Sequence, residues 1–355
     1  MTQAAPSTRS AGADTRYVRL TTWRRIGRSS ATNVTLLYIL LICGLGVAAA
    51  IAPAKLNFFT PDNIAVLAQQ IPVIAILAIG AGILMIAGEF DLSVAGIYTL
   101  APYILALGLA RWGLPLGLAL LLCLTAAVAV GSVNAWVTRY LGVPSFIATL
   151  GMMFLLRGSV RWISISPVTG QPDQITLTAP DGFRAMLAGQ TAGPLYAQTI
   201  WLLIVGGLAA ALLNRHRIGN HIFAVGGDPE AARKIGISIT AVKFTAFILC
   251  SALAAFAGIM QTARINMVDP AQTLTGLELE AIAAAVIGGV YLFGGRGSIL
   301  GMVLGAALLV TIENVLILVR APGEYMPVFV GAIVILSAII NSNVGGGRAT
   351  HRSSL

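Results

Sequence analysis

Acidic side chains in or beside long apolar segments are the residues of this sequence best suited to chemistry. Their positions are Glu89, Asp91, Glu278, Glu280 and Glu313. The first four lie at segment ends, where a carboxylate can reach water without having any function. Glu313 stands between LLVTI and NVLIL, where a carboxyl group must be neutral, paired or solvated. We therefore expect Glu313, followed by Asn314, to face the interior of a helical bundle.

A second set of polar residues forms the short stretch GDPEAARKIGI (227–237). Asp228 can accept a backbone hydrogen bond as the N-cap, and Pro229 suits the first helical position because its missing donor is not needed there. Glu230 favours the positive end of the helix dipole. Gly236 supplies a stop. The pattern predicts a short helix with its own caps.

The predicted helix spans 229–235, about two turns or roughly 10 Å. Arg233 and Lys234 favour its negative end. A helix of this length is not stable alone in water, so it must dock on something. Ala231 and Ala232 permit close approach, either to the chain's own helix ends or to another protein.

Motifs for several enzyme classes are absent from the sequence. It contains no GxxxxGK[ST] phosphate loop, no GxSxG elbow and no HExxH pair. The three cysteines and three histidines are too dispersed to suggest a metal site. We therefore expect no catalytic residues, no metal and no cofactor, although an enzyme embedded in a membrane stays a minor alternative.

The composition shows which elements must position these residues. The chain of 355 residues is 57% hydrophobic and only 10% charged, with a mean hydropathy of +0.88. A span takes roughly 20 apolar residues, which predicts an all-α, polytopic membrane bundle of about ten transmembrane helices. The segments are 33–53, 63–87, 92–110, 114–138, 143–163, 197–213, 241–263, 278–293, 298–319 and 324–341. The spans near 92, 143 and 278 are weaker, so we expect broken or re-entrant helices there.

Lysine and arginine predict the orientation. If all segments cross, 15 of the 22 lysines and arginines lie on the side of both termini, which places both termini in the cytoplasm. The expected divisions are a basic tail (1–32), a transmembrane domain (33–341) and a C-terminal tail (342–355). A twin-arginine export signal at TWRRIG is the less favoured reading. The positive charge fits membrane topology, and no motif supports nucleic-acid binding.

Two polar loops fall on opposite sides of this topology. The outer loop (164–197) is rich in proline, glycine and threonine, which predicts turns and short interfacial pieces rather than a domain. The cytoplasmic loop (214–240) contains the predicted short helix. Gly297, Gly301 and Gly305 recur at intervals of four, which favours close helix packing, within one subunit rather than between two.

Four stretches together resemble the transmembrane subunits of bacterial ATP-binding cassette importers for monosaccharides, of the ribose, xylose and arabinose type. They are GEFDLSVAG (88–96), VPSFIATLGMMFLLRG (143–158), RIGNHIFAVGGDPEAARKIGI (217–237) and LELEAIAAAVIGGVYLFGGRGSILG (277–301). They occur in the family's order, and each alone would be a weak signal. The resemblance implies a bacterial inner-membrane location.

The resemblance also implies partners. These are two cytoplasmic ATP-binding cassette subunits, an extracytoplasmic solute-binding protein and a second permease subunit, most simply a homodimer. It implies that GDPEAARKIGI is a coupling helix that fits a cleft on the ATPase. The coupling residues are then Gly227, Asp228, Pro229, Glu230, Ala231, Ala232, Arg233 and Lys234. The outer loop and the turn at 267–276 are candidates for receiving the binding protein.

The sequence departs from the resemblance at Glu89 and Phe90, where ribose permeases usually carry small or aliphatic residues. Ordinary helix packing and capping remain an equal reading for the candidate pathway. Its residues are Glu89, Phe90, Asp91, Ser93, Ser145, Phe146, Thr149, Glu313 and Asn314. We expect a permease that imports a monosaccharide or related polyol by alternating access. A branched-chain amino-acid permease and a nucleotide-independent facilitator or channel are the alternatives.

Overall fold

The computed structural model describes residues 30–51, 57–166, 169–191, 195–270 and 276–322, and the helical residues 325, 327–332, 335, 336 and 339. Most of them are helical. The helices are α2 (Ser30–Ile51), α3 (Pro61–Ile86), α4 (Val94–Ala110), α5 (Leu116–Tyr140), α6 (Ser145–Ser164), α7 (Asp181–Ala188), α8 (Ala197–Arg215), α9 (Arg217–Gly227), α10 (Pro229–Lys234), α11 (Ile239–Ile265), α12 (Leu277–Ile287) and α13 (Ile299–Leu318). Two short strands are β1 (Ile175–Thr176) and β2 (Met267–Val268).

Six of the described helices are long and apolar enough to cross a membrane, namely α3, α5, α6, α8, α11 and α13. Val34–Val47, within α2, and α4 are shorter apolar helices. This supports the predicted helical membrane protein. The tenth expected span (324–341) is described only in part, as helical pieces, and the expected tails lie outside the described residues apart from the first residues of α2.

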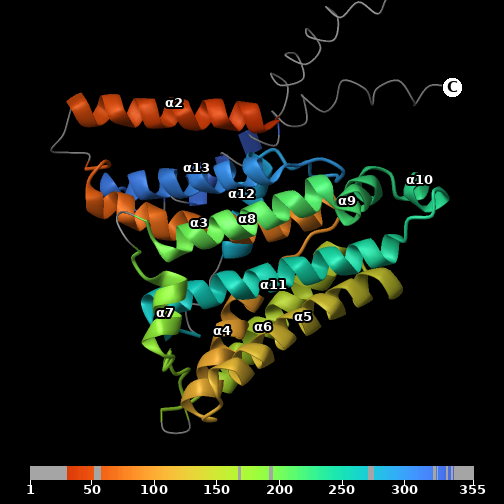
Figure 1. The fold of residues 1–355 in the computed structure, drawn as a ribbon, viewed down its shortest axis with the longest axis horizontal. Coiled ribbons are helices and arrows are strands. Elements are labelled where there is room, and N and C mark those ends of the chain that lie inside the picture. The colour runs from red at the N-terminus through yellow and green to blue at the C-terminus, as the bar shows by residue number, and fades with distance from the viewer. Residues whose placement is uncertain are drawn as a thin grey trace, which may run out of the picture.

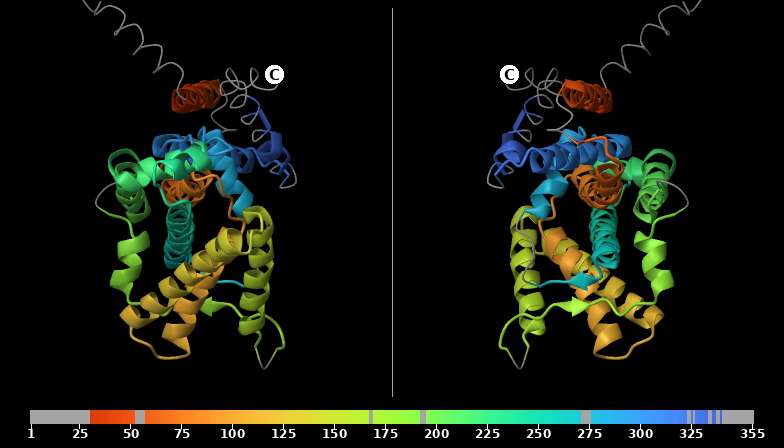
Figure 2. Two further views of the ribbon diagram at one scale, coloured as in Figure 1. Left: turned by 90° about the vertical axis from the view of Figure 1, so that its right-hand side faces the viewer. Right: turned by 90° about the vertical axis from the view of Figure 1, so that its left-hand side faces the viewer.

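Helix α11 is the centre of the bundle, because its packing against α3, α4 and α5 gives the three most extensive helix contacts. Close approach depends on glycines at the crossings. At Gly258 of α11 a methyl group would overlap the carbonyl of Tyr98 in α4, and at Gly131 of α5 it would overlap Ser251 of α11. Figures 1 and 2 show α11 between these neighbours, with α2 lying at one margin along α13.

The two ends of α11 define the two ends of the molecule. Its first residue follows α10 closely, and we call this the α10 end. Its last residue leads into β2, which pairs with β1 in an antiparallel ribbon, Ile175 opposite Val268 and Thr176 opposite Met267. We call this the ribbon end. The all-α expectation therefore misses a small sheet, which is made by two segments about ninety residues apart in the chain.

Two of the weak spans have different outcomes, and the 214–240 region contains a second helix, α9, which was not predicted from the sequence. The expectation of a broken helix near 278 fits the structure, because the 11-residue helix α12 is followed by turns with positive φ at Gly289, Gly294 and Gly295. The weak signal at 143 gives a continuous helix, α6, rather than a broken one.

The glycine repeat also differs in part from its prediction. Gly297 precedes α13, whereas Gly301 and Gly305 lie on it. Methyl groups at Gly301 and Gly305 would overlap carbonyls of Gly288 and Ala284 at the end of α12. The repeat therefore serves helix packing inside one chain, as the simpler reading expected.

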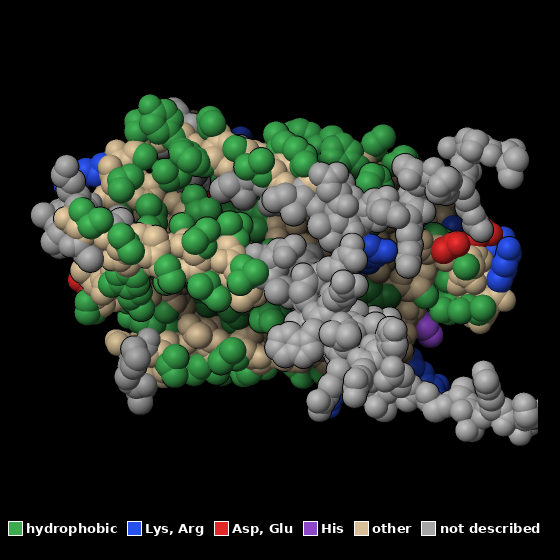
Figure 3. All heavy atoms as spheres, turned by 90° about the horizontal axis from the view of Figure 1, so that it is seen from above, with side chains coloured by type: hydrophobic (Ala, Val, Ile, Leu, Met, Phe, Trp, Pro, Cys, Tyr) green, Lys and Arg blue, Asp and Glu red, His purple; other side chains and the backbone are tan. Residues whose placement is uncertain are grey.

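The surface of the bundle is mostly apolar. In Figure 3, hydrophobic side chains cover most of the described part of the face on view, and acidic and basic side chains gather mainly at the end where Figure 1 places α10. Exposed large apolar residues occur on the outer faces of α5, α6 and α8. Such a surface suits a lipid environment, because contiguous apolar area of this extent is unusual on soluble monomers.

Candidate functional site

The short helix α10 forms as its sequence predicts. Asp228 is the N-cap, and its carboxylate accepts a hydrogen bond from the Ala231 amide at 3.0 Å. At the other end, the amides of Gly236 and Ile237 donate to the carbonyls of Arg233 and Ala232, both at 3.0 Å. Gly236 has a φ of +86°, the left-handed conformation that glycine adopts without strain. Both ends of α10 are therefore closed by its own neighbours.

Helix α10 docks one face on the bundle and leaves the other free. Ala232 is only 2% exposed and belongs to the main core, between α9 and α11. Glu230 and Arg233 form an ion pair at 2.8 Å with side chains 67% and 68% exposed. Ala231, Lys234 and Ile235 are also exposed. The helix thus presents a compact charged and apolar surface at the α10 end.

The last turn of α9, immediately before α10, is held tightly to the bundle. A methyl group at Gly226 would overlap the carbonyl of Ile86 at the end of α3. The amide of Gly295 donates to that same carbonyl at 2.8 Å. The ends of α3 and α9 and the α12–α13 turn therefore meet backbone to backbone beneath α10.

Residues 88–93, which we call the 88–93 segment, join α3 to α4 without helical structure. Two of its backbone amides are satisfied by hydroxyls of α6. Phe90 donates to the Ser145 hydroxyl at 3.2 Å, and Leu92 donates to the Thr149 hydroxyl at 3.1 Å. Non-helical backbone inside an apolar bundle needs such partners.

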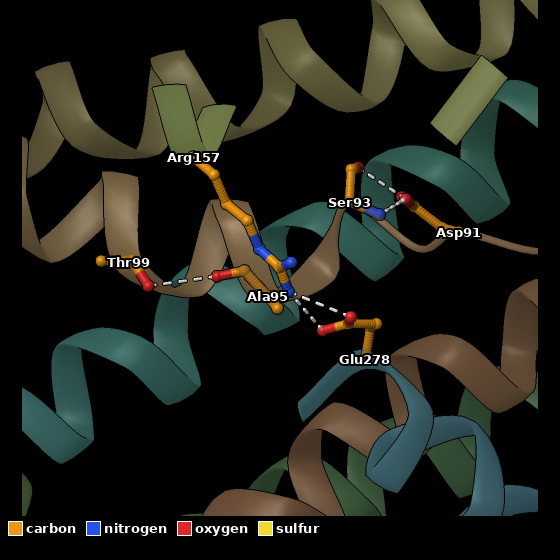
Figure 4. A network of polar contacts seen from close by, with 6 residues as sticks. All are labelled: Asp91, Ser93, Ala95, Thr99, Arg157 and Glu278. Atoms are coloured by element: carbon orange, nitrogen blue, oxygen red, sulfur yellow. Dashed lines mark hydrogen bonds and ion pairs between the residues drawn. The ribbon is translucent and has the colours of Figure 1, made fainter. Parts of the chain in front are cut away.

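Asp91 is the anchor of this segment and is 2% exposed. One carboxylate oxygen accepts from the Ser93 amide at 2.7 Å and from the Ser93 hydroxyl at 2.5 Å (Figure 4). The side-chain amide of Asn134, from α5, donates to the Ser93 hydroxyl at 2.9 Å and to the other Asp91 oxygen at 3.5 Å. These bonds hold the start of α4 against α5.

Glu89 makes an ion pair with Lys243 of α11. The two residues are 154 positions apart in sequence, and Glu89 is buried while Lys243 is half-buried. Lys243 lies in the second turn of α11, close behind α10. The pair therefore connects the 88–93 segment to the helix that follows α10.

A second ion pair joins α6 to α12. Arg157 donates two hydrogen bonds to the carboxylate of Glu278, at 3.0 and 3.1 Å, and Figure 4 shows its side chain passing close to α4. Glu278 is buried, so the reading of an interfacial carboxylate that reaches water does not hold for it. Arg157 lies within α6.

Glu313 and Asn314 lie in the last turns of α13, away from the 88–93 segment. Glu313 is half-buried rather than fully interior. Asn314 is buried and exchanges two side-chain hydrogen bonds with Asn63 of α3, at 2.9 and 2.7 Å. The expectation of an inward-facing polar site therefore fits Asn314 better than Glu313.

The structure brings together part of the candidate pathway. Glu89, Phe90, Asp91, Ser93, Ser145 and Thr149 meet at the 88–93 segment. Phe146 turns away and is 54% exposed. The hydrogen bonds of Asp91, Ser93, Ser145 and Thr149 favour capping and helix packing over the lining of an open passage.

The ribbon end unites the two segments that the sequence argument assigned to a binding protein. Besides the β1–β2 pairing, the Gln174 side chain donates to Asp269 at 2.9 Å. A cavity of about 130 Å³ lies between α4, α11 and β2, with Tyr98, Gln261 and Asp269 among its lining. Residues 271–275 of the expected turn lie outside the described residues.

Comparison with known proteins decides the family. Residues 63–338 match the family described as the branched-chain amino acid transport system, permease component. The chain belongs to this family. The permease is 35% identical to the ribose import permease protein RbsC of Escherichia coli (strain K12), over 85% of this chain and 92% of the relative.

Two further relatives of the permease are autoinducer 2 import system permease proteins LsrC. That of Enterobacter sp. (strain 638) is 30% identical over 90% of this chain and 89% of the relative. That of Yersinia enterocolitica serotype O:8 is 32% identical over 84% of this chain and 80% of the relative. No solved structure matches the permease.

Several residues that form polar contacts in the permease were not identified as candidate site residues from the sequence. Asn134, Arg157, Lys243 and Asn63 are the partners of Asp91, Glu278, Glu89 and Asn314. Each of the four is a polar residue within or at the edge of an apolar stretch, and that is the signal that could have drawn attention to them. Their pairing could not follow from it, because each partner lies at least 43 residues away.

Proposed function

We propose that the permease is the membrane-spanning subunit of an ATP-driven importer in a bacterial inner membrane. It moves a monosaccharide or related polyol by alternating access. ATP is hydrolysed by separate cassette subunits, and a solute-binding protein delivers the substrate. Two copies of the permease form the pathway, and both termini of each copy are cytoplasmic.

The observation that carries this proposal is the free face of α10. A helix that closes its own ends, buries Ala232 and exposes Glu230, Ala231, Arg233 and Lys234 is stiff enough to receive force without unravelling. The contact of Gly226, at the end of α9, with the end of α3 gives that force a route into the bundle. The family match and the relatives named as import permeases support the rest of the machine.

The substrate class rests on the relatives. The relatives RbsC and LsrC are named for the import of ribose and of autoinducer 2. The family description favours a second candidate, a branched-chain amino acid. Identifying the ligand that copurifies with the cognate binding protein separates the two, since a bound amino acid overturns the sugar assignment.

Reconstitution tests the machine. The permease and its cassette ATPase are reconstituted in vesicles, and the binding protein is supplied on the opposite side of the membrane from the ATPase. We expect labelled ribose to accumulate only when ATP is present on the side of the ATPase. Glu230→Arg and Ala231→Trp change the free face of α10. We expect both variants to insert into the membrane normally, but the amount of ribose taken up per ATP hydrolysed should fall. The dipole effect of the charge reversal is about 0.3–1 kcal/mol, so docking accounts for most of the loss.

A matched control is Asp62→Arg, which reverses a first-turn carboxylate of α3 far from α10. It is expected to leave the ratio of uptake to hydrolysis unchanged. Normal coupling in both α10 variants would remove the role of α10. Uptake that continues without the ATPase would replace the importer by a facilitator.

A further inference from the structure

Glu89 and Lys243 stand where motion of α10 enters the bundle. Lys243 lies on α11 just behind the residues that close α10, and Ser238 caps α11 by accepting a hydrogen bond from the Ala241 amide at 3.3 Å. The amide of Ile237 is bonded to Ala232 of α10. Only residues 235–238 separate α10 from α11, and this short connection is hydrogen-bonded to a helix at each end. A displacement of α10 therefore carries Lys243 with it.

Glu89 opens the segment whose backbone is fixed to other helices. Phe90 and Leu92 are bonded to α6, and Asp91 is bonded to Ser93 at the start of α4 and to Asn134 of α5. A pull on Glu89 is therefore shared by α4, α5 and α6. The Arg157–Glu278 ion pair connects α6 to α12, and α4 packs on α6.

The burial of the pair makes it specific. Glu89 and Lys243 have side chains 9% and 21% exposed. Charges in such surroundings are stable only when they are paired, because each loses its hydration. Lys243 also lies near the positive end of the α11 dipole, where a lone cation is unfavourable. Each charge thus needs the other, and α11 and the 88–93 segment move together.

We propose that the Glu89–Lys243 ion pair is the positioning link that carries motion of α10 to the 88–93 segment and its helices. The inference deepens the proposed function, on which it rests for the source of the motion. This role requires no contact of the pair with ATP or with the substrate. Its role is to make α11 and the segment one mechanical unit.

The test measures motion of the segment rather than uptake. Cys43, Cys123 and Cys250 are replaced by alanine and Phe90→Cys supplies one thiol. The labelling rate with N-ethylmaleimide is measured in the permease–ATPase complex, with and without ATP and vanadate. With the pair intact, we expect the labelling rates with and without ATP and vanadate to differ by about fivefold or more, since about fivefold is the lower limit of typical coupling between two sites.

The decisive variant is the double replacement Glu89→Gln with Lys243→Met, which removes the link and leaves no buried charge behind. Its labelling rate is expected not to respond to ATP, while the ATPase continues to hydrolyse at the parent rate. The exchange Glu89→Lys with Lys243→Glu restores an ion pair and is expected to restore the response. Single replacements are avoided because each strands a buried charge and can lower the folded yield.

A matched control removes another polar contact close to the start of α11. Arg139 of α5 donates to the Thr240 hydroxyl at 2.8 Å, and Arg139→Gln with Thr240→Val should leave the response intact. A response preserved in the neutral double variant, or absent from the exchange variant, overturns the proposal. If the parent complex responds but takes up no ribose, only the substrate assignment fails. If the parent does not respond to ATP, both the role of α10 and this link are wrong.

Discussion

Helix α10 and the 88–93 segment are two short polar interruptions between apolar helices, and each is organised by an aspartate. Asp228 bonds to Ala231, three residues away, and every other cap of α10 lies within residues 228–237. Asp91 bonds to Ser93 but also to Asn134, and its neighbours depend on Ser145, Thr149 and Lys243. The first region is locally self-sufficient, whereas the second is completed by three other helices.

This difference separates what each region can tolerate. A change in α10 alters a local structure and its exposed face, because most of its charged atoms are in water. A change in the 88–93 segment leaves buried donors or acceptors without partners, because no water replaces them. This contrast predicts that substitutions in the 88–93 segment lower the stability of the bundle more than substitutions in α10 do.

Asp91→Ala should have the largest effect. The variant removes the acceptor for the Ser93 amide, the Ser93 hydroxyl and Asn134, so we expect a loss of about 3 kcal/mol in the free energy of unfolding. Denaturant unfolding in detergent micelles measures it. Asp91→Asn keeps one acceptor oxygen and should lose less. An unchanged unfolding midpoint in Asp91→Ala would mean that the network does not hold α4.

Thr149→Val should have an intermediate effect. The replacement keeps the shape of the side chain but removes the acceptor for the Leu92 amide, which costs about 1–3 kcal/mol when the amide stays buried. Thr245→Val is the control, because the Thr245 hydroxyl only donates to the Ala241 carbonyl of its own helix. Equal losses in the two variants would contradict a special role of the 88–93 segment.

Asp228→Ala should have the smallest and most local effect. Loss of an N-cap costs about 1 kcal/mol, and the cost falls on α10 because its hydrogen bonds are internal. Hydrogen exchange of the amides in residues 229–237 should speed up, while the unfolding midpoint of the bundle stays unchanged. Asp228→Ser retains a capping oxygen and should exchange as the parent does. A global loss of stability would show that α10 is part of the core.

The same contrast explains how far the sequence could be interpreted. The caps and both ends of α10 were predictable, because Asp228, Pro229 and Gly236 act on neighbours a few residues away. Six of the ten expected spans correspond to described helices long and apolar enough to cross a membrane, since length and hydropathy decide them. The membrane class and the permease family followed from these features together with the motifs.

The partners within the bundle could not be predicted in the same way. The sequence places Glu89, Asp91 and Glu278 at the ends of apolar segments, yet it does not say that they are buried or that Lys243, Asn134 and Arg157 pair with them. Those pairings depend on how helices cross, which is decided by contacts such as Gly258 on Tyr98. The interruption after α12 was expected from the weak apolar signal near 278, but the place where the helix ends was not.

The continuity of α11 has a consequence for how the two faces of the molecule communicate. One uninterrupted helix of 27 residues runs from the cap behind α10 to the strand that pairs with β1. At 1.5 Å per residue it is about 40 Å long, and it contains no proline and, within its length, only one glycine, at a crowded crossing. A displacement of the β1–β2 ribbon and a displacement of α10 therefore act on opposite ends of the same continuous helix.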